Sequence, residues 1–524
     1  MPVSRFWLLL LLAALPVLSA AADDCNGSVP VDCATAMLQQ GRIPAAIAVL
    51  EKLTSEDPRN IQALNLLGVA FSAAGDLQKA DVRLRQALQL DPAYLPALRN
   101  LSINQFALRE ADLGKAGLET VLKVSPNDEV AHMYLGEIAF KSKQYAAAAG
   151  HYAKARARAY PVILHYAECL LHTGRKDEMS ALLRAIPAED TQKQFQSGML
   201  LGDAGSYLDA APFFERARAH ASDPYTAAYD QTLMLIRGGE YPKAIQLASE
   251  LFAAGLGRAE LYNLVSEAYL KTGQADKAVD MLRTAIKLEP GAEDSYVDLA
   301  GIYLDQAKYD LGAEVVDAGL KRLPDSYRLH LHRGLSLAQQ GLAEASIRDF
   351  EIARRLSPSQ SLPYVALGFA WMQTGEISKA VDVLRTQVKA KPDDFMLPYI
   401  LGIALTRLGT DTGAEAKAAF ETSGRLNPRF SRSRAEMGKL LLQSGDVKGA
   451  IEQLETAVKL DPEDSTATYQ LGQAYRRNGE AARGQEMLAR VVKLRHQKDE
   501  TDPNEEMKHL IREGIASEQH PVAK

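Results

Sequence analysis

Residues 287–292 read KLEPGA, and the same place in later segments is filled by KRLPDS at 321–326, RLSPSQ at 355–360 and KAKPDD at 389–394. The four prolines of these segments follow one another at intervals of 34 residues. Small residues recur in the same phase between them, as Ala300, Gly334 and Gly368 and as Ala307, Gly341 and Gly375. A constant period of this length indicates that one supersecondary unit is repeated along the chain.

The segment 61–94 shows what one unit contains. Apolar residues at helical spacing, among them Leu64, Leu67 and Phe71, predict a helix over 61–74. Gly75 supplies the backbone freedom for a turn, and a second helix is predicted over 77–90. Pro92 then ends the unit, because the residue before a proline is disfavoured in the helical region.

These residues resemble the tetratricopeptide repeat: a large apolar residue, a small residue in each of the two helices, an apolar or aromatic residue, and a closing proline. The segment 431–464 repeats the pattern with Met437, Gly438, Ala450, Leu454, Ala457 and Pro462. The resemblance covers nearly all of residues 34–496 and implies an all-α fold, a right-handed superhelical α-solenoid of about fourteen helix-turn-helix units. Such arrays do not need one large core, since each unit packs on its neighbours.

The phase of the repeat divides the chain. The predicted segments are 1–22, a signal peptide; 23–33, a short linker; 34–160, a regular arm; 161–258, degenerate units and a candidate hinge; 259–496, a second regular arm; and 497–524, a polar tail. The tail contains one amphipathic stretch at 505–516, with Met507, Leu510, Ile511 and Ile515 on one face. We expect this helix to dock loosely as a cap on the end of the array.

The N-terminus has the pattern of a secretory signal peptide. Arg5 precedes an apolar run from Phe6 to Leu15, and small residues end at Ala22. The sequence therefore predicts an exported protein, periplasmic or secreted, of the kind found among bacterial members of the family, and leaves open whether the segment is cleaved or kept as an anchor. The formal net charge of −6 argues against nucleic-acid binding. No later stretch has the length of a membrane span.

Two cysteines lie close together behind the signal. Cys25 and Cys33 are separated by seven residues, among them Gly27 and Pro30. In an oxidising compartment they are expected to form a disulfide in front of the first repeat, with two free thiols as the alternative.

The sequence contains no recognisable catalytic motif. It lacks a phosphate-binding loop, a nucleophile elbow and a metalloprotease helix, and the repeats leave no room for a catalytic domain. We therefore expect no enzyme activity and no cofactor. His165, Cys169 and His172 share one face of a predicted helix and form a weak metal candidate, since a fourth ligand is missing. The alternative is that Cys169 packs as a small apolar residue.

The resemblance also implies a binding surface, because the first helix of each unit lines the concave side in this family. Transferred to this chain, that surface gives the partner-binding residues Arg328, Leu331, Leu335, Leu362, Val365, Phe369, Met372, Met396, Tyr399, Ile403 and Arg407, with Arg432, Lys439, Arg476 and Arg477 as a basic flank. Aromatic residues and methionines suit an amphipathic helix or an extended peptide. Alternatively, several of these side chains pack between neighbouring helices.

The predicted function is a non-catalytic scaffold that binds a protein or peptide ligand in a cell-envelope assembly or secretion system. Two alternatives stay open. One is a scaffold for polysaccharide export or glycan binding, which would need exposed aromatic rings and carboxylates. The other is an accessory subunit of a separate enzyme.

Overall fold

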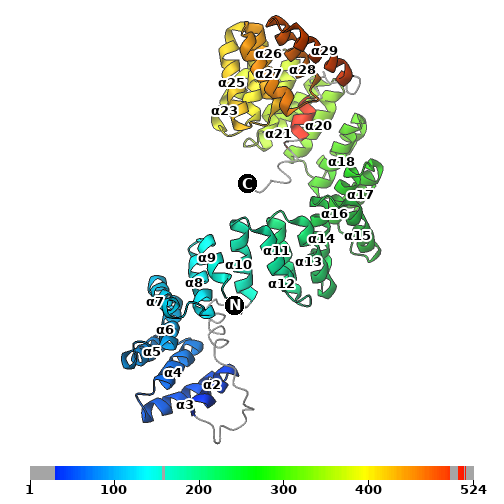
Figure 1. Ribbon diagram of the computed structural model, residues 1–524. Coiled ribbons are helices and arrows are strands. Elements are labelled where there is room, and N and C mark those ends of the chain that lie inside the picture. The colour runs from blue at the N-terminus through cyan, green and yellow to red at the C-terminus, as the bar shows by residue number, and fades with distance from the viewer. Residues whose placement is uncertain (1–29, 156–159, 496–505, 513, 515–524) are drawn as a thin grey trace. The chain divides into compact units, whose positions relative to one another are not determined.

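The computed structural model describes residues 30–155, 160–495, 506–512 and 514, and within these ranges the regular structure is helical without strands. The chain divides into two compact units, the first ending at Glu240 and the second starting at Tyr241. Figure 1 shows each unit as a succession of short helices joined by tight turns. The predicted all-α repeat fold is confirmed, whereas the predicted signal peptide lies outside the described residues.

The first unit contains helices α2 to α14. Their bounds are α2 (Pro30–Gln39), α3 (Ile43–Glu56), α4 (Ile61–Ala74), α5 (Leu77–Leu90), α6 (Leu95–Ala107), α7 (Ala111–Val124), α8 (Glu129–Lys141), α9 (Tyr145–Tyr152), α10 (Tyr160–His172), α11 (Lys176–Arg184), α12 (Thr191–Asp203), α13 (Tyr207–His220) and α14 (Tyr225–Arg237).

The second unit contains helices α15 to α29 and one 3₁₀ turn. Their bounds are α15 (Tyr241–Ala253), α16 (Ala259–Lys271), α17 (Ala275–Leu288), α18 (Glu293–Asp305), α19 (Tyr309–Leu320), α20 (Tyr327–Gln339), α21 (Ala343–Leu356), α22 (Leu362–Gln373), α23 (Ile377–Ala390), α24 (Met396–Leu408), η1 (Thr410–Thr412), α25 (Gly413–Leu426), α26 (Ser431–Ser444), α27 (Val447–Leu460), α28 (Ser465–Arg477) and α29 (Ala481–Arg495). A further helical stretch, residues 506–512 together with 514, is called the tail segment below.

Local sequence signals place the helix ends well. The predicted helices 61–74 and 77–90 are α4 and α5 with the same bounds. Asn60 and Asp76 start them, since their side-chain oxygens accept hydrogen bonds from backbone N–H groups of the first turn. The first helix differs from its prediction: α2 begins at Pro30, so Cys33 lies inside it and not in a linker. Proline is favoured at a first helical position, where it lacks only an N–H that would be unpaired.

The helices form two layers within each unit. Most consecutive helices pack against each other, and even-numbered helices also contact the next even-numbered helix, for example α4 with α6 and α22 with α24. Small residues allow the close approach. A Cβ atom on Gly68 of α4 would lie only 2.5 Å from Cγ of Leu84 in α5. In the same way, a Cβ atom on Gly198 of α12 would lie 2.9 Å from a ring carbon of Phe214 in α13.

A second recurring contact joins the proline that closes one repeat to the first helix of the next repeat. The hydroxyl groups of Tyr296 and Tyr364 donate hydrogen bonds to the carbonyl oxygens of Pro290 and Pro358, each at 3.2 Å. His330 stands at the equivalent position between them, and its Nε2 lies 3.2 Å from the carbonyl oxygen of Pro324. At these three positions a polar side chain thus pairs with the carbonyl oxygen of the closing proline, which lies just beyond the end of a helix.

Candidate functional site

The tail segment lies in the core of the second unit. The side chains of Met507, Leu510 and Ile511 are fully buried. They belong to the same hydrophobic cluster as residues of α20, α22 and α24, including Leu335, Phe369 and Tyr399. We call the face formed by α18, α20, α22 and α24 on this side the inner face. Figure 1 draws the tail segment in red. It follows α18 by some two hundred residues in the sequence, counted from Asp305 to Glu506.

Two polar contacts fix the ends of the tail segment on the inner face. The hydroxyl group of Tyr399 on α24 donates a hydrogen bond to Oε1 of Glu506. At the other end Arg512 forms an ion pair with Asp305 of α18. The guanidinium group of Arg512 also passes over Gly301, where an added Cβ would lie 3.0 Å from Nη2.

This position differs from the predicted end cap. The described contacts of the tail segment include Asp305 on α18, Tyr399 on α24 and, through Gly514, Leu362 on α22. The amphipathic pattern of the tail is confirmed, because its predicted apolar residues 507, 510 and 511 are the buried ones. Ile515 lies outside the described residues. The predicted docking position, at the end of the array, was wrong. Periodicity identifies the apolar face of a helix but not the surface that covers it.

The predicted groove residues are mostly buried. Eight of them have side chains that are at most 7% exposed, namely Leu331, Leu335, Leu362, Val365, Phe369, Met372, Tyr399 and Ile403. Met396 is half-buried and Arg407 is exposed. Arg328 is engaged by Glu293 and Asp294 of α18, with Nη1 3.0 Å and 2.5 Å from their carboxylate oxygens. The surface is therefore not an open groove: the chain's own tail segment is packed into the same cluster.

Burial controls the protonation of the groups below the tail segment. Burial raises the pKa of Tyr399, and the nearby carboxylate of Glu506 raises it further, so the phenol remains a hydrogen-bond donor. Burial lowers the pKa of His332 to about 4, and the positive charges of Arg512 and Arg328 contribute in the same direction. His332 is therefore neutral at pH 7, and its Nδ1 lies 2.9 Å from the carbonyl oxygen of Arg328.

The repeat phase could have selected two contacts of the tail segment that were not named as groove residues. Gly301 stands 34 residues before Leu335, and Asp305 follows it one helical turn later on the same face, whereas Glu506 lies outside the repeats. In the predicted basic flank, Lys439 pairs with Glu436 at 3.2 Å, and Arg477 donates to the carbonyl oxygen of Leu442. These two cations are thus already engaged locally.

The three residues of the weak metal candidate, His165, Cys169 and His172, do not converge on one site. Nδ1 of His165 lies 2.8 Å from Oε1 of Glu137, and its ring stacks on Phe140. The ring of His172 stacks on Tyr145 instead. Cys169 is fully buried, and burial together with nearby carboxylates raises the pKa of its thiol to about 12. In the part of the chain that is described, no group of three or more such side chains is arranged to hold a metal ion.

The structure describes two of the three cysteines. Cys33 is disulfide-bonded, and Cys169 is a free thiol. The predicted partner, Cys25, lies outside the described residues, so the pairing stays a prediction.

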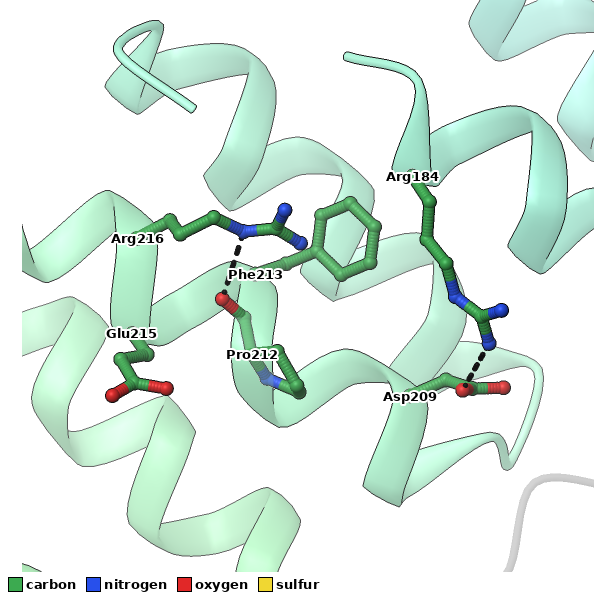
Figure 2. A pocket seen from close by; sticks show the side chains of 6 residues that line it. All are labelled: Arg184, Asp209, Pro212, Phe213, Glu215 and Arg216. Carbon is green, nitrogen blue, oxygen red and sulfur yellow. Dashed lines mark hydrogen bonds and ion pairs between the residues drawn. The ribbon is translucent and has the colours of Figure 1, made fainter. Parts of the chain in front are cut away.

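The first unit has a pocket of about 430 Å³, lined by residues of α11 and α13. Figure 2 shows these side chains. The guanidinium group of Arg216 lies over the ring of Phe213 at 4.4 Å and donates to the carbonyl oxygen of Pro212. Arg184 is paired with Asp209 at 2.8 Å. Both cations that line the pocket therefore already have partners within the chain.

The succession of paired, closely packed helices defines a helical-repeat protein. Sequence profiles described as tetratricopeptide repeat match residues 33–94, 100–162 and 195–257 in one case and 139–200 and 269–333 in another, and a profile described as TPR repeat matches 438–479. Together they cover more than half of the chain. The chain belongs to the tetratricopeptide repeat family.

Individual relatives are distant. DnaJ homolog subfamily C member 3 of Rattus norvegicus is 22% identical over 266 residues, which are 51% of this chain and 44% of that protein. Protein O-mannosyl-transferase TMTC1 of Homo sapiens is 23% identical over 209 residues, 38% and 23% of the two chains. The chain thus spans less than half the length of these curated relatives. The crystal structure of yeast Tom70 is 15% identical, covers 88% of this chain and 96% of its own, and superposes with a TM-score of 0.41.

Within the described ranges, none of the helices combines the length and the apolar character needed to cross a membrane.

Proposed function

We propose that this protein is a non-catalytic scaffold that binds a helical segment of a partner protein on the inner face of its second unit. One observation carries the proposal: the inner face already holds an amphipathic helix, the tail segment, with three apolar side chains fully buried. A surface that buries such a helix from its own chain has the shape and the apolar character to bind one from another protein.

The chemistry of the inner face favours a peptide over a sugar polymer. Carbohydrate binding uses exposed aromatic rings, on which sugar rings stack. Here the rings of Phe369 and Tyr399 are each 1% exposed, and the segment packed with them is a helix. Buried apolar side chains with a few polar contacts at the edge are typical of helix-in-groove recognition.

The cell-envelope context rests on residues 1–22 alone. Export is tested by N-terminal sequencing of the protein recovered from its natural host. A mature chain that begins near Asp23 supports export with cleavage, and a chain that keeps Met1 and stays in the cytoplasmic fraction contradicts it.

The binding function is tested in the full chain with Leu510→Asp, which places a charge in the buried face of the tail segment. The probe is a fluorescein-labelled synthetic peptide with the sequence of residues 503–516, and the control peptide carries Leu510→Asp. We expect saturable binding of the probe and no binding of the control. If a chain that circular dichroism shows to be folded fails to bind the probe, the proposed function is wrong.

A further inference from the structure

We propose that the tail segment is an internal ligand of the inner face, and that the partner is an amphipathic helix with the same pattern, which binds by displacing it. The pattern is a carboxylate, apolar residues one, four and five positions later, and a cation six positions later, as in Glu506, Met507, Leu510, Ile511 and Arg512. This inference rests on the proposed function and adds to it the chemistry of the partner and the competition with the tail.

The apolar part of the pattern follows from the helix period. Positions 507, 510 and 511 share one face of a helix, and their side chains are the fully buried ones. Position 514 continues this face, where Gly514 lies against the side chain of Leu362 so closely that an added Cβ would overlap it. His509, on the other face, is exposed. A partner helix therefore needs about two turns with large apolar residues and a small residue at the last position.

The charged ends of the pattern fix the direction of the helix. The carboxylate of Glu506 meets the hydroxyl donor of Tyr399, and the guanidinium group of Arg512 meets the carboxylate of Asp305. A helix bound in the opposite direction would place its own carboxylate beside Asp305 and its cation beside the Tyr399 hydroxyl. Repulsion between the two carboxylates would disfavour that orientation.

The contacts are also of a kind that a competitor can replace. The side chain of Asp305 is 56% exposed and that of Arg512 is 30% exposed, so solvent screens this ion pair. Three buried apolar side chains stabilise the docked tail, but ordering its backbone opposes docking. Covalent attachment favours the tail by raising its effective concentration. A partner helix with the same anchors and further contacts outside the pattern can therefore displace it.

The experiment compares probe binding to full-length chains that differ only in the tail. Leu510→Asp releases the tail, and His509→Asp adds the same charge on the exposed face as a matched control. The probe is the labelled 503–516 peptide, measured by fluorescence anisotropy. We expect the Leu510→Asp chain to bind at least about tenfold more tightly than the wild type and the His509→Asp chain, because the tail leaves at most about a tenth of the wild-type molecules open.

A second variant locks the tail without disturbing its apolar anchors. An ideal Cβ of Gly514 lies 3.3 Å from Cγ of Leu362, so Leu362→Cys with Gly514→Cys brings two thiols within the range of a disulfide. The oxidised double variant should not bind the probe, and reduction should restore binding. The wild type with and without reductant controls for the disulfide of Cys33.

The outcomes separate the two proposals. Equal probe affinity for the wild type, Leu510→Asp and locked chains overturns the internal ligand, while the proposed binding function stands. No binding to a folded Leu510→Asp chain overturns the proposed function. If Leu510→Asp does not fold, hydrogen exchange of the wild type decides: added probe should speed exchange of the amides at 506–512, and unchanged exchange at saturating probe overturns the inference.

Discussion

The hydroxyl group of Tyr399 donates a hydrogen bond of 2.5 Å to the carboxylate of Glu506, 107 residues further along the chain. This contact connects α24, in the middle of the second unit, to a segment that follows the last repeat. Because Tyr399 is 1% exposed, its hydroxyl group has no water to replace Glu506 as acceptor while the tail is docked. The repeat array and the tail segment are thus coupled by specific polar chemistry as well as by apolar packing.

Tyr399→Phe should loosen the tail without unfolding the array. The ring remains in its packing, while the hydrogen bond to a charged acceptor, which contributes about 1.5–3 kcal/mol, is lost. We expect the amides of residues 506–512 to exchange at least about tenfold faster, and the labelled 503–516 peptide to bind no more tightly, because it would lose the same hydrogen bond. Tyr364→Phe is the matched control, because its hydroxyl group bonds to Pro358 instead. Unchanged exchange at 506–512 contradicts the role of this contact.

Ala307→Gly should stabilise the second unit. Ala307 is the residue between α18 and α19 that stands in phase with Gly341, and it adopts a left-handed φ of +53°. This conformation costs a residue with a Cβ about 1–2 kcal/mol, part of which glycine recovers. We expect the urea midpoint to rise by an amount equivalent to about 1 kcal/mol. Gly341→Ala, at φ +76°, should lower it by a similar amount. A lower midpoint for Ala307→Gly contradicts this explanation.

Helix positions were predictable because the forces that set them are local. The bounds of α4 and α5 follow from apolar spacing, from Asn60 and Asp76 at the helix starts and from Gly75 between the helices.

The docking of the tail was not predictable, because it depends on contacts remote in sequence. The pattern of Met507, Leu510 and Ile511 defines an apolar face, but nothing near it specifies Leu362, Tyr399 or Asp305 as its surroundings. The repeat phase selected Leu362 and Tyr399 as inner-face residues without showing that another part of the chain covers them. The proline contacts at Tyr296, His330 and Tyr364 were detectable in principle, since these residues share the 34-residue spacing.

Loss of the proline contact should destabilise the array at each position where it occurs. Tyr364→Phe removes a donor to the carbonyl oxygen of Pro358 and should cost about 1 kcal/mol, measured by urea unfolding. Tyr296→Phe should have a similar effect, and the double variant should show the sum, since the two sites lie in different repeats. Wild-type stability for both single variants would mean that water replaces the hydroxyl groups at no cost.

Limited proteolysis should cut first within the predicted hinge 161–258. The boundary between the two compact units, at Glu240 and Tyr241, falls inside this range. Segments with few stabilising contacts open more readily and are cleaved first. We expect early fragments that end near residue 240, identified by mass spectrometry at low protease concentration. Initial cleavage spread evenly over the repeats contradicts the hinge.

Acid should release the tail segment through His332. This imidazole is 2% exposed, and burial, with Arg512 and Arg328 nearby, lowers its pKa to about 4. In the unfolded chain its pKa is about 6.5, so the unfolded state binds more protons between pH 6.5 and pH 4. The free energy of unfolding therefore falls as the pH is lowered through this window, by up to about 3 kcal/mol. Protonation also places a third positive charge beside Arg512 and Arg328.

The test compares the wild type with His332→Asn, which keeps a donor for the carbonyl oxygen of Arg328 but does not titrate. Between pH 6.5 and pH 4 the wild type should lose stability more steeply than the variant. Other groups contribute to both chains equally: burial lowers the pKa of His151, which acts in the same direction, and raises that of Asp230 to about 6, which acts in the opposite direction. Parallel stability curves would show that His332 does not control the docking of the tail.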